Sequence, residues 1–515
     1  MEYPYANFYE MLSSHARSHP RRVAVLTEAS KLSYGKLLKK VDTLARFLEL
    51  SNIKRGDRVA IFMQNAKEFV VSLFAITKIG AVAVPVNTFL KSEEVAYILN
   101  DCGAKMLMAS AEQKEVVESL WGQTPIERVV WEGNYEALDN KNIGFDEIFE
   151  ILKSHEHMEL PKIDDLAVII YTSGTTGNPK GAMLSYRNIL HNCKAIGELT
   201  SFTHKDRFIV YLPMFHAFTL TVTVIMPIYY GASYVIVRKI MPFSNIIKQI
   251  LFKRVTMFVG VPDVYNALSR AKLPWYFMWF QKIRYFVSGA APLSEATIER
   301  FTAKFKRAKL LEGYGLSECS PVVSVNPPWK QKALSVGPAI PGVEIKIADD
   351  NMLELPVGEI GEIIVKGDNV MQGYLNRPTA TDETIVNGWL LTGDMGYLDE
   401  DGFLFIVDRK KDLIISKGIN IYPREIEEVI NSFEGVGASA VVGMPDEKSG
   451  EVPVAFIEEA EDCKVDVKAL KGFLKEKLAN FKVPKDIRII DELPKNATGK
   501  VLKRLLKESL LKSSV

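Results

Sequence analysis

Residues 171–181 read Tyr171-Thr-Ser-Gly-Thr-Thr-Gly-Asn-Pro-Lys180-Gly181 and follow the apolar run from Leu166 to Ile170. Glycines let backbone amides turn toward an anion, hydroxyl groups donate hydrogen bonds, and a lysine supplies positive charge. The segment therefore predicts a loop that binds phosphate. It is not a P-loop, because that motif has Gly immediately before its Lys and this chain has Pro179. A plain turn between two strands is the simpler interpretation, but the length and order of the segment argue against it.

Size and composition point to a globular protein with more than one domain. The chain has 515 residues, of which 47% are hydrophobic, and this is more than one simple core holds. Its 64 basic and 63 acidic residues nearly cancel, so the overall charge gives no reason to expect a nucleic acid partner. Any binding of anions must depend on a local site.

We expect a cytoplasmic protein. The first ten residues carry acids and lack an apolar core, unlike a signal peptide. Residues 208–237 contain no Asp, Glu, Lys or Arg, but proline, histidine and glycine leave uninterrupted only about half of the roughly 20 residues that a membrane-spanning helix needs. We expect buried core there. The cysteines show neither disulfide nor metal-ligand spacing, which fits a reducing compartment; they are Cys102, Cys193, Cys319 and Cys463.

Predicted helices and strands alternate through most of the chain. Apolar residues recur at helical spacing from Leu37 to Leu48, and a strand at 59–62, a helix at 68–79 and a strand at 81–84 follow. Such a strand–helix–strand unit builds parallel sheets. Further strand-like runs lie at 209–211, 234–237, 257–259 and 285–288. We predict the α/β class, with a large N-terminal domain of layered sheets in several subdomains.

The character of the chain changes near residue 410. Asp408-Arg-Lys-Lys-Asp412 is a charged segment typical of an exposed connector. The residues beyond it are rich in Lys and Glu and show helical patterns at 424–432 and 467–478. We predict two domains, residues 1–409 and a small α+β cap of residues 410–515.

Further motifs follow the phosphate loop in a fixed order. Gly289-Ala-Ala-Pro-Leu293 is small enough for a flat ring to approach its backbone, and Gly313-Tyr-Gly-Leu-Ser-Glu318 supplies an aromatic face, a hydroxyl and a carboxylate. Trp389-Leu-Leu-Thr-Gly-Asp394 ends in an acid and precedes Arg409; Pro494-Lys-Asn-Ala-Thr-Gly-Lys500 presents a lysine. Together these motifs resemble the adenylate-forming superfamily, which includes acyl-CoA synthetases, aryl-CoA ligases, luciferases and the adenylation domains of peptide synthetases.

The resemblance implies where ATP and Mg²⁺ bind, although Glu318, Asp394 and Lys500 would each be ordinary turn or surface residues if taken singly. Asp394 and Arg409 would clamp the ribose, since the guanidinium is forked and always charged. Mg²⁺ takes one or two protein oxygens, here from Ser173 and Glu318. The phosphates would contact Thr172, Ser173, Gly174, Thr175, Thr176, Gly177 and Lys180. The nucleotide would also contact Gly289, Ala290, Ala291, Pro292, Glu312, Gly313, Tyr314, Gly315 and Ser317.

The resemblance also implies two chemical steps. A carboxylate attacks the α-phosphate of ATP and releases pyrophosphate, and the thiol of coenzyme A then displaces AMP from the acyl adenylate. Lys500 would bridge the carboxylate and the α-phosphate, where a cation offsets the developing charge. Lys500, Glu318 and His216 are the predicted catalytic residues. No side-chain nucleophile is required, so catalysis rests on positioning and charge.

Members of the superfamily rotate the cap between the two steps, about a hinge two residues after the arginine. The hinge here would be Lys411, although an ordinary linker charge is the alternative. After rotation, coenzyme A would contact Ser416, Lys417, Gly418 and Asn420. Ile415 stands where several relatives have a lysine, which puts any role of that lysine in doubt.

Leu212-Pro-Met-Phe-His-Ala-Phe218 resembles the entrance of the acyl pocket. Relatives that activate amino acids have aspartate after the Phe, whereas this chain has His216, so a buried substrate ammonium would be uncompensated. An amino acid is therefore disfavoured. A role for His216 in the acyl site and a simple core histidine are both open. Residues 259–262 and Gly289 would line the same cavity, and their small size is compatible with a long apolar tunnel.

Seven aromatic residues lie within positions 275–286, flanked by Lys272, Lys282 and Arg284. Core packing is the default interpretation of such a segment. The alternatives are the wall of an acyl tunnel and a patch that contacts the membrane interface, where aromatic side chains lie beside cations. The last alternative would add peripheral contact with the inner face of the membrane.

We predict an ATP-dependent medium- or long-chain fatty acid:CoA ligase that uses ATP, Mg²⁺ and coenzyme A. The alternatives within the enzyme class are an aryl-CoA ligase and an acyl-adenylate synthetase that loads a carrier protein. A catalytically silent sensor of acyl groups or nucleotides is the non-enzyme alternative. The sequence does not decide the oligomeric state, and a homodimer is compatible with it.

Overall fold

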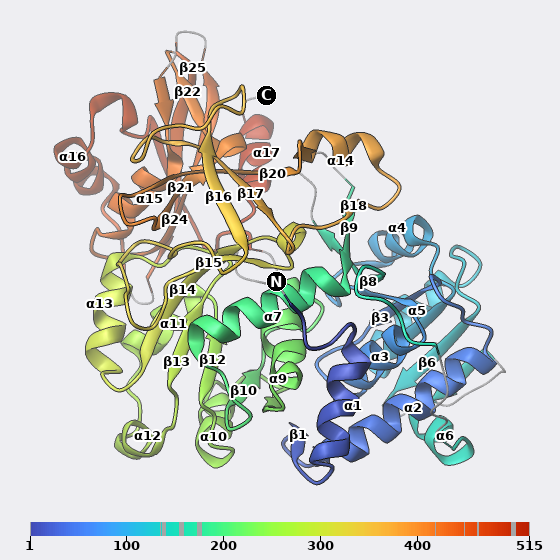
Figure 1. The fold of residues 1–515 in the computed structure, drawn as a ribbon. Coiled ribbons are helices and arrows are strands. Elements are labelled where there is room, and N and C mark those ends of the chain that lie inside the picture. The colour runs from blue at the N-terminus through green and yellow to red at the C-terminus, as the bar shows by residue number, and fades with distance from the viewer. Residues whose placement is uncertain are drawn as a thin grey trace.

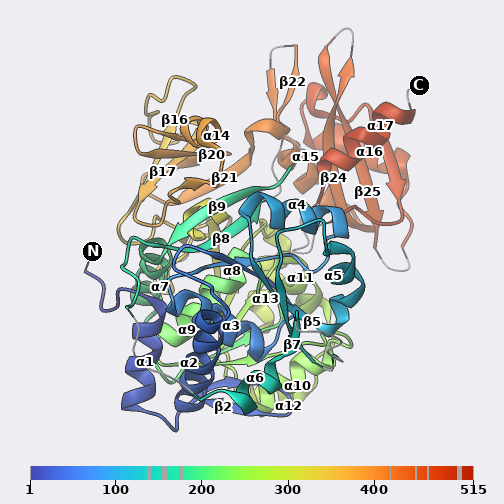
Figure 2. The same ribbon diagram turned by 90° about the vertical axis from the view of Figure 1, so that its right-hand side faces the viewer.

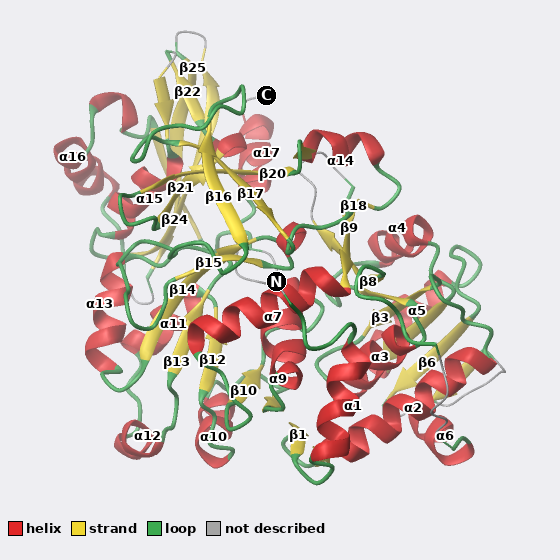
Figure 3. Cartoon of the chain, in the orientation of Figure 1, coloured by secondary structure: helices red, strands yellow, loops and turns green. Residues whose placement is uncertain are grey.

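The computed structural model describes residues 2–133, 135, 141–153, 159–172, 178–417, 419–446, 449–460, 463–495 and 501–513. Within these residues the strands form two eight-stranded sheets and two five-stranded sheets. Helices lie between and around the two larger sheets (Figures 1 and 3). The α/β class with layered sheets is confirmed.

The first large sheet carries the strand that leads into the phosphate loop. β3 and β4 pair in parallel and are connected by α3 (Lys67–Lys78), which confirms the predicted strand–helix–strand unit. β8 and β9, on either side of the loop, pair antiparallel, and β18 pairs with β9. The strands, in sheet order, are β18 (Gly373–Tyr374), β9 (Lys180–Ser185), β8 (Leu166–Thr172), β4 (Val82–Pro85), β3 (Arg58–Phe62), β5 (Met106–Ser110), β6 (Arg128–Glu132) and β7 (Asn142–Gly144).

The second large sheet carries the motifs predicted to bind adenine and the acyl group, at the carboxyl ends of parallel strands. β13 pairs in parallel with β12 and β14, so the segments that follow these strands meet at one edge. The strands, in sheet order, are β15 (Val322–Val325), β14 (Lys309–Gly315), β13 (Tyr285–Ser288), β12 (Met257–Gly260), β10 (Arg207–Val210), β11 (Ser233–Ile236), β1 (Val23–Leu26) and β2 (Lys31–Ser33).

One continuous apolar core joins the two large sheets through α1 (Phe8–Ser18), α2 (Tyr34–Leu50), α3 and α7 (Tyr186–Thr200). α2 begins after Ser33, whose hydroxyl accepts the amide of Lys36, as expected for a capping serine. Most of residues 208–237 are buried, which confirms core in that region. A π-helix from Leu220 to Ile225 lies between α8 (Ala217–Thr219) and α9 (Met226–Tyr229). No helix of the described residues has the length and apolar character to cross a membrane.

A five-stranded sheet follows, made of β16 (Val343–Ala348), β17 (Gly361–Gly367), β20 (Trp389–Leu398), β19 (Ile385–Val386) and β21 (Leu404–Arg409). The last sheet has its own apolar core and lies at one end of the molecule (Figure 2). It contains β23 (Ile419–Ile421), β22 (Ile414–Ser416), β25 (Gly450–Glu459), β24 (Val436–Asp446) and β26 (Asp486–Ile490). Its helices are α15 (Pro423–Asn431), α16 (Val467–Lys477) and α17 (Lys503–Ser513). We call residues 410–515 the cap.

Candidate functional site

A largely apolar pocket of about 570 Å³, including its open mouth, lies where β13 and β14 end. Gly289 and Ala290 line it beside β13, and residues 313–317 line it from β14 onward. The predicted adenine and acyl motifs therefore meet at one place. Ala291 and Pro292, and residues 259–262 with them, lie outside the lining. The lining residues are Ile196, His216, Ala217, Phe218, Val222, Val287, Ser288, Gly289, Ala290, Gly313, Tyr314, Gly315, Leu316, Ser317, Pro321 and Val322.

Two glycines of the motifs have steric reasons to be glycine. A Cβ on Gly315 would lie 1.9 Å from the carbonyl oxygen of Pro321, and one on Gly289 would lie 3.1 Å from the Phe218 ring. Ala290 has φ 70°, an uncommon conformation for a residue with a side chain. The Phe218 ring therefore packs directly against Gly289 at the narrow turn after β13.

His216 caps α8 at the inner side of this pocket. Its Nδ1 accepts the amide of Phe218 at 3.3 Å, so the proton of the neutral ring lies on Nε2. Burial lowers the pKa of His216 to about 4. The side chain is therefore a neutral hydrogen-bond donor in the pocket, and it carries no charge that would attract or repel an acid.

Glu318 forms a polar cluster with three residues of the first large sheet. Its Oε1 accepts the hydroxyl of Tyr374 at 2.9 Å and the hydroxyl of Thr172 at 3.4 Å. Lys180 Nζ lies 5.1 Å from the centre of the Tyr374 ring. Tyr374 is on β18 and Lys180 on the neighbouring β9, so Tyr374 contacts both the lysine and the carboxylate. Glu318 and Lys180 thus lie near Tyr374, and Glu318 also contacts Thr172, which belongs to the predicted phosphate loop.

The Glu318 cluster fits a magnesium ion in its donor chemistry. Both hydrogen bonds of the described residues go to Oε1, which leaves Oε2 to ligate a cation. The described residues contain no group of three or more His, Cys, Asp or Glu that could hold a metal. One carboxylate suits Mg²⁺ that takes its other ligands from phosphate and water.

The predicted ribose clamp is assembled at the open end of the β20–β21 hairpin. Asp394 and Arg409 are opposite each other in register, with Oδ1 of the carboxylate 3.3 Å from Nε of the guanidinium. Oδ2 accepts the hydroxyl of Tyr314 at 2.6 Å. Burial and the nearby carboxylate raise the pKa of Tyr314 well above its usual value, so Tyr314 is a firm donor. Tyr314 of the predicted adenine motif is therefore hydrogen-bonded directly to Asp394, the predicted ribose ligand.

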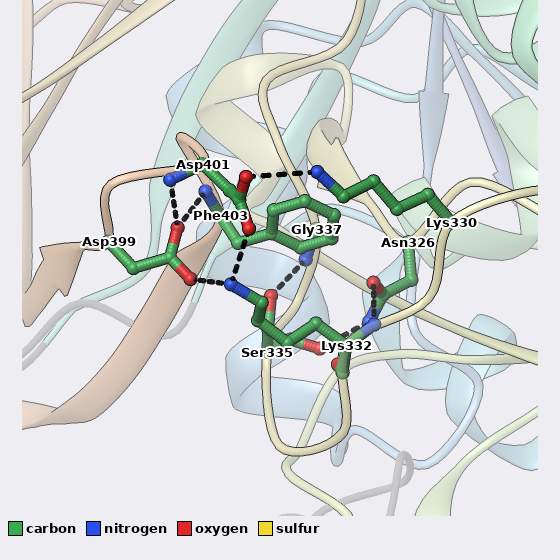
Figure 4. A network of polar contacts seen from close by, with 8 residues as sticks. All are labelled: Asn326, Lys330, Lys332, Ser335, Gly337, Asp399, Asp401 and Phe403. Carbon is green, nitrogen blue, oxygen red and sulfur yellow. Dashed lines mark hydrogen bonds and ion pairs between the residues drawn. The ribbon is translucent and has the colours of Figure 1, made fainter.

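The closed end of the same hairpin is held by an ion-pair network (Figure 4). Lys332 contacts both Asp399 and Asp401, and Lys330 contacts Asp401 at 3.0 Å. Oδ1 of Asp399 accepts the amides of Asp401 and Phe403. The network ties the β20–β21 turn to the loop after β15 and so fixes the hairpin that carries Asp394.

Glu312 and the residues before the cap lie at the junction of the two regions. Burial raises the pKa of Glu312 to about 7, and the positive charge of Arg424 from α15 opposes that rise. Asp408 accepts the amide of Arg424 at 2.8 Å, and Arg424 donates to the carbonyl of Ile406 at 2.7 Å. Lys411 is exposed, and desolvation of its amine, then the charge of Arg409, lowers its pKa.

The segment that presents the last motif has a defined stem. Lys495 and Val501 form a β-bridge, and the amide of Leu502 donates to the carbonyl of Pro494 at 2.7 Å. Lys495 Nζ lies 4.0 Å from Asp263 of the N-terminal region. The stem of the Lys500 motif therefore faces the large sheets.

The residues predicted to contact coenzyme A lie partly in a second pocket, about 910 Å³ with its mouth, in the cap. Ser416 and Lys417 line it, whereas Asn420 lies on β23 opposite Ile415 and outside the lining. Lys417 has φ 51° and donates its amide to the carbonyl of Ser449 at 2.7 Å. The pocket lining also includes three more lysines, Lys471, Lys475 and Lys485.

Several predicted residues lie outside the described part of the chain, and their roles stay predictions. They are Ser173, Gly174, Thr175, Thr176, Gly177, Gly418 and Lys500. Tyr374 and the Lys332 network were not predicted from the sequence. An isolated tyrosine or lysine carries no local signal, and only the pairing of distant strands brings it to the site.

Core packing is wrong for most of the aromatic segment. Phe277 and Phe286 are buried, but four residues of α12 (Trp275–Phe280) are exposed. These are Trp275, Tyr276, Trp279 and Phe280.

Comparison with known families covers most of the chain. A family described as AMP-binding enzyme matches residues 12–375, and one described as AMP-binding enzyme C-terminal domain matches residues 425–500. A long-chain-fatty-acid–CoA ligase of Bacillus subtilis is 34% identical, covering 98% of this chain and 95% of its own. A feruloyl-CoA synthase of an Amycolatopsis species is also 34% identical, covering 95% and 96%.

Solved structures agree over the same span. ATP-bound MatB from Rhodopseudomonas palustris superposes with a TM-score of 0.89 at 31% identity, covering 98% of this chain and 99% of that one. o-Succinylbenzoate CoA synthetase from Bacillus subtilis, in complex with its acyl-adenylate intermediate, gives a TM-score of 0.85 at 31% identity and 98% coverage of both chains.

Proposed function

The chain belongs to the adenylate-forming AMP-binding enzymes, and we propose that within this family it is an ATP-dependent fatty acid:CoA ligase. The observation that carries the proposal is the junction of a nucleotide site with an apolar pocket. Tyr314 contributes to both, because it lines the pocket and donates to Asp394 of the ribose clamp. An acid bound in this pocket would have its carboxylate beside the nucleotide.

The first step would use residues from three sheets. Lys180 would bind the phosphates that leave, and Glu318 would hold Mg²⁺, which would offset the negative charge of the phosphates. Asp394 and Arg409 would fix the ribose, so that the α-phosphate is presented to the carboxylate. Nε2–H of His216 would donate toward the carboxylate or the new acyl ester, and Lys500 would approach between the two anions.

The second step would need the cap to move, because Lys500, as the resemblance implies, would occupy the approach used by the thiol. We place the boundary at residues 409 and 410 and the hinge at Lys411. The lysines near Ser416 and Lys417 would then bring positive charge toward the phosphates of coenzyme A. Thiol attack on the adenylate would form the thioester and release AMP.

The apolar lining supports a fatty acid, and the neutral His216 supports an uncharged acyl chain. Fatty acids of sufficient length partition into membranes, so contact between the enzyme and a bilayer belongs to the same proposal. A homodimer remains compatible with the chain. An aryl acid is the second candidate, because the rings of Phe218 and Tyr314 line the same pocket and a feruloyl-CoA synthase is among the relatives.

A panel of acids tests the proposal. AMP release would be measured with ATP and coenzyme A for acetate, fatty acids from C6 to C18, benzoate and ferulate. Highest kcat/KM for a medium- or long-chain fatty acid is expected. Preference for ferulate or benzoate would favour the aryl-CoA ligase. If AMP release requires a carrier protein, the acyl group is transferred to that protein and not to coenzyme A. If the protein shows no acid-dependent ATP–pyrophosphate exchange, it is a silent sensor.

A further inference from the structure

A cluster of exposed aromatic side chains covers the outer face of α12. Trp275, Trp279 and Phe280 expose 73%, 66% and 62% of their surface, and Tyr276 is exposed as well. Phe252, at the end of the neighbouring α10 (Ser244–Phe252), is 80% exposed. We call these five residues the α12 patch. Soluble proteins seldom leave a group of large apolar side chains in water without a function.

The helix is fixed so that these side chains point outward. Phe277 is buried in the apolar cluster beneath the second large sheet, together with Ile247 and Ile250 of α10. Arg307 lies 5.7 Å from the centre of the Trp279 ring. The fold therefore anchors α12 through one aromatic residue and presents the others.

The segment around the α12 patch is strongly cationic although the whole chain is nearly neutral. Between residues 244 and 284 there is one acid, Asp263. The same segment contains seven basic residues, namely Lys248, Lys253, Arg254, Arg270, Lys272, Lys282 and Arg284. Of these, only Arg284 has an ion pair within the described residues, with Asp206. Unpaired cations beside aromatic residues match the headgroup region of an anionic bilayer.

The position of the α12 patch suits such contact. α10 and α12 lie at the end of the molecule opposite the cap in both ribbon views (Figures 1 and 2). A bilayer on that side would leave the cap free to rotate and the nucleotide site open to water. α12 precedes β13, so the α12 patch lies at the amino end of a strand whose carboxyl end lines the acyl pocket.

We propose that the α12 patch docks the protein reversibly on an anionic lipid bilayer. Aromatic side chains enter the interface and the surrounding lysines and arginines bind the headgroups. The purpose of the docking rests on the proposed function, because it would hold a fatty acid ligase where its substrate collects. The docking itself needs no catalysis and is measured separately.

Vesicle binding tests the proposal directly. The full chain would be incubated with phosphatidylcholine vesicles, with or without about one third phosphatidylglycerol, and bound protein separated by flotation. We expect the protein to bind vesicles that contain phosphatidylglycerol at least tenfold more strongly than vesicles of phosphatidylcholine alone. This binding should be lost as salt rises from about 10 mM to 1 M, because the screening length falls from roughly 30 to 3 Å.

The variant Trp275→Ser/Trp279→Ser/Phe280→Ser should lose at least tenfold in vesicle binding. Trp329→Ser is the matched control, because Trp329 is 65% exposed but lies in the loop after β15; it should bind like the natural protein. Both should retain activity toward octanoate, which separates docking from ligase function. The gentler Trp275→Phe/Trp279→Phe should keep binding but lose quenching of tryptophan fluorescence by brominated lipid.

Three outcomes would overturn the proposal. The natural protein could stay with the unbound fraction at low salt, or the triple variant could bind vesicles as well as the Trp329→Ser control. Alternatively, the triple substitution could convert a dimer into a monomer without any dependence on vesicles. In that case the α12 patch is a contact between two copies of the chain.

Discussion

Replacement of Asp394 by asparagine tests the ribose clamp. A carboxylate offers about four acceptor positions, and two of those on Asp394 are used by Tyr314 and Arg409. The other two remain for ribose hydroxyls. A hydrogen bond to a charged group contributes about 1.5–3 kcal/mol and one to a neutral group about 0.5–1.5. Loss of charge across two bonds would therefore cost about 2–3 kcal/mol, or roughly 30- to 160-fold in kcat/KM for ATP.

The assay is acid-dependent ATP–pyrophosphate exchange at varied ATP. Glu400→Gln is the matched control, because Glu400 is an exposed acid on the turn of the same hairpin; it should change kcat/KM for ATP by less than about threefold. The KM for the acid should change little in Asp394→Asn. The clamp is refuted if the two variants lose ATP affinity equally, or if Asp394→Asn behaves like the natural protein.

Three further substitutions separate the steps and the charge states. Lys500→Ala should abolish pyrophosphate exchange but spare thioester formation from a supplied acyl adenylate; equal loss of both would contradict its role. Lys411→Pro should spare pyrophosphate exchange but abolish thioester formation, because proline restricts the backbone torsion that a rotating cap needs. Normal thioester formation in this variant would contradict a hinge at Lys411. His216→Gln addresses acid stability. Since the pKa of His216 falls to about 4 on folding, the unfolded chain binds more protons below about pH 6.5 and stability declines toward pH 4. The glutamine variant should lose less stability over that range, by at most about 3 kcal/mol in urea unfolding; an unchanged pH dependence would contradict the neutral buried histidine.

The sequence predicted most of the fold because the signals are local. Glycine-rich turns after apolar runs locate the ends of β8, β13 and β14, and alternating helices and strands indicate parallel sheets. The partners of Glu318 were not predictable in this way. Tyr374 reaches Glu318 only because β18 pairs with β9, and nothing within the segment around Tyr374 indicates that pairing.

The aromatic segment shows a second limit of sequence reasoning. Composition alone cannot tell a buried aromatic cluster from an exposed one, and core packing is the commoner outcome. α12 is a helix of only six residues, and one face of it contacts the core. Phe277 lies on that face and is buried, whereas Trp275, Tyr276, Trp279 and Phe280 are exposed. The length of the helix, which the sequence does not fix, decides the outcome.

The contacts around Lys411 explain why a single residue could serve as the pivot. On one side, Lys410 is held by Glu362 at 2.9 Å, and the same glutamate accepts the amide of Gly393 next to the ribose acid. On the other side, Ile414 is buried in the core of the cap. Residues 411–413 are thus the segment left to absorb a change of backbone torsion. Rotation there would break the hydrogen bond from Arg424 to Asp408 but keep Asp394, Arg409 and Lys410 together. The nucleotide would therefore stay bound while the cap moves Lys500 away from the adenylate and lets the thiol of coenzyme A approach it.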